Sequence, residues 1–186
     1  MSLYHYSENP NIECFVPRAP LAHPDKEARV WAIDDWHSPL YFLPSDCPRS
    51  TFWPVETTSD EDRRLYWPDP QVRMVIAIEH AWFERFLKTK VYRYRMPEQT
   101  FISCGDYGAH VSEHTVVPLG VEAVGSLPDA MAANSVDLRV MPSLKAFSHF
   151  LMDTSFHWSF IRMRNALDWD MPPGNPVMPK ERPAHV

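Results

Sequence analysis

Proline restricts the fold of this chain more than any other residue, because it occurs 19 times among 186 residues. The usual proline share is about 5%, and each proline fixes φ and removes a backbone N–H donor. Many of these prolines end short apolar runs, as in FVP, YFLP and FWP. We therefore expect short secondary-structure elements that are joined by stiff connections.

Glycine is scarce, with only 5 in the chain, and none forms a G-x-G-x-x-G or a P-loop pattern. The two commonest glycine-rich loops that cradle phosphate are therefore absent from the sequence. The formal net charge is −6 and the pI is about 5.8, whereas nucleic-acid phosphates attract basic surfaces. We accordingly expect no nucleic-acid partner.

The sequence carries no signal of a membrane or of an oxidising compartment. It has no apolar window of about 18 or more residues, and its start lacks a basic segment followed by an apolar run. The cysteines, Cys14, Cys47 and Cys104, are odd in number, far apart and outside any C-x-x-C pair. We expect no membrane span, no disulfide scaffold and no thiolate zinc site, and thus a cytoplasmic protein.

The clearest strand is QVRMVIAIE (71–79), because it is rich in β-branched residues. HAWFERFLKTK (80–90) follows it and places aromatic side chains at helical spacing. Ser126 and Asp129 form a capping-box pattern that begins a second helix, and a third is expected at 143–153. Further short strands are expected at 3–7, 30–33, 50–53, 91–96, 115–125 and 136–141.

Four segments give a less regular pattern. The segment 8–18 predicts a single helical turn, and the polar run 55–70 predicts an exposed loop. The segment TSFHWSFIRMRN (154–165) fits both a strand and a helix, and we favour the helix. Pro118 interrupts the strand expected at 115–125, so we place that strand at a sheet edge or give it a bulge.

The order of elements predicts an α+β fold, because short strands and helices mix without a regular βαβ repeat. DDWHSPLYFLP (34–44) adds a short helix that is capped by Asp34 or Asp35. The chain is 45% hydrophobic, which suits one ordinary core. We expect a single α+β domain over 1–167 and a proline-rich tail over 168–186.

Three stretches of the chain resemble known proteins. LYHYSENPNIECF, VWAIDDWHSPLYF and the region from VYRYRM to VEAVGSL are similar to the opening and the later half of small ADP-ribosyltransferases of the rifampin ADP-ribosyltransferase type. The whole chain also resembles an uncharacterised bacterial family, a domain of unknown function. The first resemblance implies a split, strongly bent β core with helices packed outside, and an NAD cleft that uses no glycine-rich fingerprint.

This resemblance also implies a nucleotide-binding role for residues near the first two strands. His5 matches the strand-one histidine that binds the nicotinamide-side ribose, and Trp31 takes the place of a tyrosine that stacks on nicotinamide. The expected cofactor-binding residues are His5, Tyr6, Ser7, Arg18, Trp31 and Tyr41. NAD or a related nucleotide is the implied ligand, and transfer of ADP-ribose is the implied reaction.

Two residues are candidates for the acidic residue of the family, Glu113 in VSEHT and Asp106 in CGDYG. Glu98 is a weaker, third candidate. Cleavage of the nicotinamide–ribose bond passes through an oxocarbenium-like state, which a carboxylate near the ribose stabilises. A histidine fixes the other hydroxyl by a hydrogen bond. The implied catalytic residues are therefore Glu113 and Asp106.

Two other functions stay open on the sequence alone. A non-enzymatic module of the same fold would have its cleft closed by aromatic side chains, which the 7 tryptophans favour. A metal-dependent hydrolase would need three or more histidines and acids at one point. His110 and His114 are four residues apart, but HVSEH reads as extended and separates them by about 13 Å, so we expect no metal site.

Overall fold

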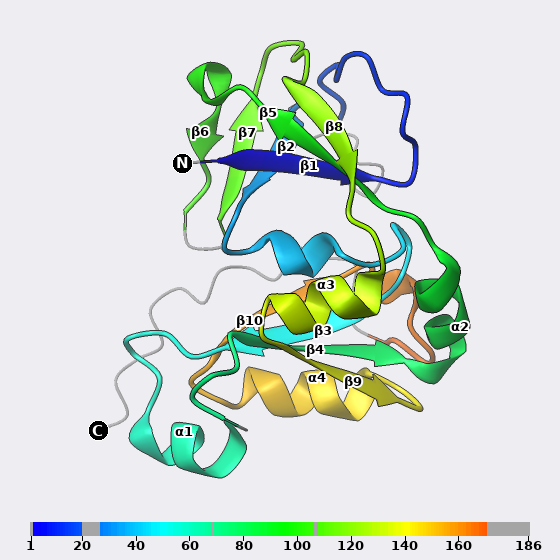
Figure 1. Ribbon diagram of the computed structural model, residues 1–186. Helices are drawn as coiled ribbons and strands as arrows, with labels where there is room; N and C mark the ends of the chain where they lie inside the picture. The colour runs from blue at the N-terminus through cyan, green and yellow to red at the C-terminus, as the bar shows by residue number, and fades with distance from the viewer. Residues whose placement is uncertain (1, 20–26, 68, 106–107, 171–186) are drawn as a thin grey trace.

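The computed structural model places two β-sheets one above the other, with short helices between and around them (Figure 1). It describes residues 2–19, 27–67, 69–105 and 108–170. The fold is therefore of the predicted α+β class. No helix in these ranges is long and apolar enough to cross a membrane. Most of the tail predicted at 168–186 lies outside the described residues.

The upper sheet in Figure 1 has six strands in the order β6-β7-β2-β1-β5-β8, and every neighbouring pair is antiparallel. Its strands are β1 (Leu3–Ser7), β2 (Val30–Asp34), β5 (Tyr92–Met96), β6 (Ile102–Ser103), β7 (Ala109–Ser112) and β8 (Gly120–Ala123). β1 lies near the middle, between β2 and β5. β8 is an edge strand, as predicted from Pro118, and Val116 before it forms an isolated bridge with Phe15.

The lower sheet has four strands in the order β10-β3-β4-β9. They are β3 (Arg49–Trp53), β4 (Met74–Glu79), β9 (Val136–Met141) and β10 (His157–Ile161). β4 pairs with β9 in parallel and with β3 in antiparallel. Every residue of β4 is buried, which explains its continuous apolar run, since a strand covered on both faces does not alternate.

The helices cover the two faces and one end of the lower sheet (Figure 1). They are α1 (Asp60–Tyr66), α2 (His80–Lys88), α3 (Leu127–Ala133) and α4 (Lys145–Met152), with the 3-10 turns η1 (Ser38–Tyr41), η2 (Glu98–Thr100) and η3 (Met163–Asn165). α3 and η1 lie between the two sheets, and α4 lies on the opposite face of the lower sheet. Ser126 caps α3 as predicted, because its Oγ accepts from the Asp129 N–H at 3.4 Å.

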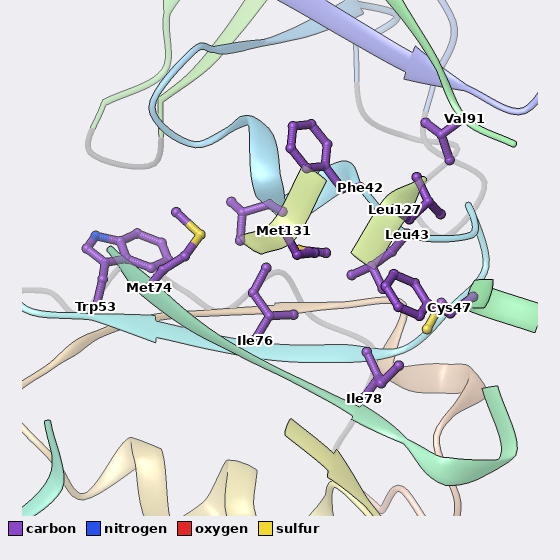
Figure 2. Close-up of a cluster of buried hydrophobic side chains, with 12 residues drawn as sticks. Phe42, Leu43, Cys47, Trp53, Met74, Ile76, Ile78, Val91, Leu127 and Met131 are labelled. Carbon is purple, nitrogen blue, oxygen red and sulfur yellow. The ribbon is translucent and has the colours of Figure 1, made fainter. Parts of the chain in front are cut away.

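The space between the sheets is filled by apolar side chains. Figure 2 shows them meeting between β3 and β4 below and η1 and α3 above. The buried members are Leu40, Phe42, Leu43, Cys47, Trp53, Met74, Ile76, Ile78, Phe86, Val91, Leu127 and Met131. Here the region between the layers is a packed core.

Three local expectations were wrong. The segment 154–165 contains β10, because Trp158 and Phe160 alternate onto one face and stack at 4.5 Å. The polar run 55–70 contains α1, which Ser59 caps and whose first turn is acidic. The segment 8–18 has no helical turn; Phe15 pairs with Val116 as an extended bridge.

Candidate functional site

The His5 side chain lies on the outer face of the upper sheet, the face that is turned away from the lower sheet, and it packs there against apolar side chains. Its Nδ1–H donates to the Trp31 carbonyl oxygen at 2.8 Å, and its ring lies 4.5 Å from the ring of Phe15. Burial lowers the pKa of His5, and the hydrogen bond to Trp31 opposes this only in part. The segment that carries Phe15 thus covers the face beside His5.

Tyr6 projects from the opposite face of the same sheet, because successive side chains of a strand alternate. Its ring stacks on Tyr41 of η1 with centroids 6.1 Å apart and planes at 5°, and Phe42 packs edge-on at 5.6 Å. Burial raises the pKa of Tyr6 to about 12. The register of β1 and β2 places Trp31 on this same face, where it is 42% exposed.

The remaining predicted residues lie apart from both groups. Ser7 Oγ accepts from the Asn9 N–H at 3.1 Å, and the Arg18 backbone pairs with that of Arg29. Glu113 is exposed and forms an ion pair with Arg29 at 2.5 Å, beside a surface hollow.

Asp106 lies outside the described residues, and Glu98 is exposed at the start of η2. The structure therefore brings together Tyr6 with Tyr41, and His5 with the Trp31 carbonyl. It does not gather the predicted cofactor-binding residues on one face. Their roles, and that of Glu113, stay predictions.

A carboxylate and a histidine that sequence reasoning did not pair lie together where β2 enters η1. Asp34 Oδ1 accepts from the His37 ring at Nδ1 (2.8 Å) and from the His37 backbone N–H (2.7 Å). Ser38 Oγ–H adds a bond to the Asp34 carbonyl at 2.9 Å. The sequence predicted Asp34 or Asp35 as the cap of this helix, but His37 is the N-cap of η1, and Asp34 accepts from the His37 N–H just before the turn begins. The D-x-x-H spacing of Asp34 and His37 is the sequence signal from which the contact between the carboxylate and the His37 ring could have been predicted.

This Asp34–His37 pair lies in an aromatic setting. The His37 ring is 4.6 Å from Trp36 and 5.3 Å from Trp53, both edge-on, and the two indoles are 5.8 Å apart. Trp53 is buried, whereas Trp36 is 40% exposed. Arg73 lies over the Trp36 ring at 5.0 Å and donates to the Trp36 carbonyl oxygen. Trp53 therefore closes one side of the pair. The other side, at Trp36, is open to solvent and carries the Arg73 guanidinium.

Burial lowers the pKa of His37, although Asp34 acts in the opposite direction. The lowered pKa favours the neutral imidazole, and a neutral ring in this hydrogen bond carries its proton on Nδ1, facing the carboxylate. In that tautomer Nε2 carries a lone pair that accepts a hydrogen bond. The arrangement is chemically suited to hold a hydroxyl group.

Gly108 closes one side of the Asp34–His37 pair. A Cβ built at this position would meet His37 Nδ1 at 2.1 Å and Asp34 Oδ2 at 2.6 Å, and the residue has φ +65. The Gly108 carbonyl oxygen also accepts from the Asp34 N–H at 2.9 Å. Only glycine fits this close approach without moving the pair.

Acid is expected to destabilise the fold through His5 and His37. Both have a native pKa below the ordinary 6.5, so below pH 6.5 the unfolded chain binds more protons than the native one. The free energy of unfolding should fall as the pH drops from 7 to 5, at up to about 1.4 kcal/mol per pH unit for each histidine. Urea denaturation across this range measures the slope.

The variant that carries both His5→Gln and His37→Asn should flatten this pH dependence. His80→Gln, at an exposed position, is the matched control and should leave the slope unchanged. Equal slopes in the wild type and the double variant would contradict the assignment.

Metal binding has no donor set here. In the part of the chain that the structure describes, no group of three or more His, Cys, Asp or Glu side chains is arranged to hold a metal ion.

Comparison with known proteins gives a match to a protein family. No curated protein and no solved structure matches the chain. The model of a family of unknown function, DUF6886, matches residues 4–166, which include all of both sheets except Leu3, together with the Asp34–His37 pair. The chain therefore belongs to the DUF6886 family.

Proposed function

We propose that this domain binds a nucleotide-class small molecule at the Asp34–His37 pair. The observation that carries the proposal is the geometry of the His37 ring, which Asp34 orients between Trp36 and Trp53. An indole face stacks on a purine or nicotinamide ring, and such stacking contributes about 1–3 kcal/mol per base. His37 Nε2 accepts a hydrogen bond from a ribose hydroxyl.

Arg73 supplies the cation of this site. It lies over Trp36 and donates to the Asp35 carbonyl oxygen at 3.0 Å, so its guanidinium is held at the exposed rim. An anionic ligand that stacks on Trp36 would meet this charge. NAD is the first ligand to test, because the sequence resemblance implies it. We propose binding rather than ADP-ribose transfer, since Asp34 is already engaged by His37.

One observation favours a second function, a non-enzymatic structural module. The Phe15 ring covers His5, and apolar side chains fill the space between the sheets. A module of this kind would bind no nucleotide at either histidine.

Nucleotide binding is expected to raise the melting temperature. A ligand at tenfold its Kd stabilises the native state by about 1.4 kcal/mol, which is roughly 3–5 °C for a domain of this size. NAD, ADP-ribose, AMP and nicotinamide are each titrated at millimolar concentration by thermal shift, and binding is confirmed by isothermal titration calorimetry. His37→Asn and Trp36→Ala should each weaken binding by tenfold or more.

His149→Asn is the matched control, because His149 also faces a carboxylate, Asp170 at 3.8 Å, but is itself exposed on α4. It should bind as the wild type does. Loss of binding in His5→Ala with full binding in His37→Asn would move the site to His5. Absence of any shift with all four ligands would reject the binding proposal and leave the structural module.

A further inference from the structure

Arg49, the first residue of β3, is buried with only 2% of its surface exposed. Its Nη1 donates to the carbonyl oxygens of Cys47 at 3.0 Å and Pro44 at 3.5 Å. Burial lowers the pKa of Arg49 to about 10, but the guanidinium is still charged at pH 7. A cation is thus held inside the fold by the loop 44–48.

Within the part of the chain that the structure describes, this guanidinium has no countercharge beside it. Among the described residues no carboxylate lies within 4.0 Å of it, and its Nε has no hydrogen-bond partner. Buried charges in proteins are normally paired, because an uncompensated one costs several kcal/mol. A buried polar atom without a partner points to a bound ion or water that completes the site.

A second guanidinium approaches the same loop from the other end of the chain. Arg162, just before η3, donates from Nε to the Ser45 carbonyl oxygen at 3.0 Å and opposes the charge on Arg49. Arg162 is exposed. Two positive groups at one loop repel each other, and an anion bound between them would remove that repulsion.

Glu8, whose carboxylate contacts the loop, already has partners other than Arg49 and Arg162. Glu8 Oε1 accepts from the Ser45 N–H at 2.8 Å and faces Arg85 at 3.7 Å. Tyr41 closes the inner side, with its ring 5.5 Å from the Arg49 guanidinium. Around the loop there are therefore two arginines, the half-buried Tyr41 ring, the already paired Glu8 and the exposed Asp46 of the loop itself.

We propose that the loop 44–48 binds a phosphate group through Arg49 and Arg162. Guanidinium groups present a planar fork of N–H donors that matches the oxygens of phosphate. The group is either free inorganic phosphate or the phosphate of a nucleotide. The site is independent of the Asp34–His37 pair, because Arg49 and Trp53 lie at opposite ends of β3, about 13 Å apart. Figure 2 shows Trp53 and Cys47 at opposite ends of the buried cluster.

The test compares sodium phosphate with sodium chloride at matched ionic strength and pH, on the full chain. Phosphate should raise the melting temperature and bind with a measurable heat in calorimetry. Arg49→Met replaces the buried cation by an apolar side chain of similar length, so the phosphate effect should vanish. Arg162→Gln, at an exposed position, should raise the Kd for phosphate at least tenfold.

Arg164→Gln is the matched control, since Arg164 is exposed on the neighbouring η3. Its Kd for phosphate should equal that of the wild type. Equal melting temperatures in phosphate and chloride would overturn the proposal, as would a phosphate effect that survives in Arg162→Gln. If Arg49→Met fails to fold, Arg162→Gln against Arg164→Gln decides the outcome.

AMP separates the two sources of the phosphate group. A Kd for AMP at least tenfold below that of inorganic phosphate, with both raised by Arg162→Gln, assigns the site to a nucleotide phosphate. Equal Kd values assign it to free phosphate. His37→Asn should leave the phosphate Kd unchanged, so failure of the Asp34–His37 proposal and failure of this one give different results.

Discussion

Replacing Glu79 by alanine should lower the free energy of unfolding by about 2–5 kcal/mol. Glu79 ends β4 and is 3% exposed. Its carboxylate accepts from the Leu144 N–H at 3.2 Å and from the Leu167 N–H at 3.0 and 3.2 Å. These two donors belong to the start of α4 and to the segment after η3, so one side chain fastens two later parts of the chain to the central strand.

The loss follows from the donors that Glu79→Ala leaves behind. A buried N–H without an acceptor costs about 1–3 kcal/mol, and both donors depend on this carboxylate. Glu79→Gln keeps one acceptor oxygen and should cost less. Urea denaturation monitored by circular dichroism measures all three proteins.

Glu84→Ala is the matched control for this experiment. Glu84 is exposed on α2 and pairs with Lys88 at 2.6 Å, and such surface pairs contribute roughly 0.5 kcal/mol or less. A Glu79→Ala variant within 1 kcal/mol of the wild type, on the scale of about 1–3 kcal/mol per orphaned donor, would show that water or other groups satisfy the two N–H donors.

The sequence predicted those elements whose signal is local. β4 was identified because its segment is rich in β-branched residues, and α3 because Ser126 and Asp129 stand at capping distance. α1 was missed, although Ser59 and the acidic residues after it carry the same kind of cap signal. High polarity there was interpreted as a loop, but an exposed helix with a charged first turn is equally polar.

The candidate site was predicted only in its local part. Asp34 or Asp35 was expected as a cap; His37 is the N-cap of η1 instead, and Asp34 accepts from its N–H. The contacts of His37 with Trp53 and Gly108 join segments that are distant along the chain. They depend on sheet order and register, which a single sequence does not specify. Arg49 was missed for the same reason. Its charge is unusual only because the residue is buried, and burial depends on how distant segments pack.

For the segment that follows β1, the sequence predicted correctly that its apolar residues pack on the sheet, but it predicted the wrong backbone conformation. We expected an apolar patch docked on the sheet as a helical turn. Phe15 does dock, but as an extended bridge to Val116, with the Tyr94 hydroxyl donating to the Asn9 carbonyl oxygen at 2.6 Å. Asn9 and Pro10 favour a turn and then extended backbone, so a helix had no favourable start there.

Replacing Phe15 by alanine should cost about 3–5 kcal/mol of unfolding free energy. Phe15 is buried and packs edge-on against Tyr94 at 5.2 Å and beside His5 at 4.5 Å. The change leaves a cavity and admits water to His5, so the pKa of His5 should rise toward 6.5. Urea denaturation gives the first effect, and an NMR titration of the His5 ring gives the second.

The same variant separates the two roles of His5. If Phe15 only completes the core, Phe15→Ala loses stability and gains no affinity for NAD. If the segment covers a nucleotide cleft, as the ADP-ribosyltransferase resemblance implies, opening it should tighten NAD binding at His5 while His5→Ala abolishes that gain. Val16→Ala, next to it and 51% exposed, should change neither quantity, because no buried contact is lost. Unaltered stability in Phe15→Ala would contradict both roles, since each requires the ring to be packed against His5.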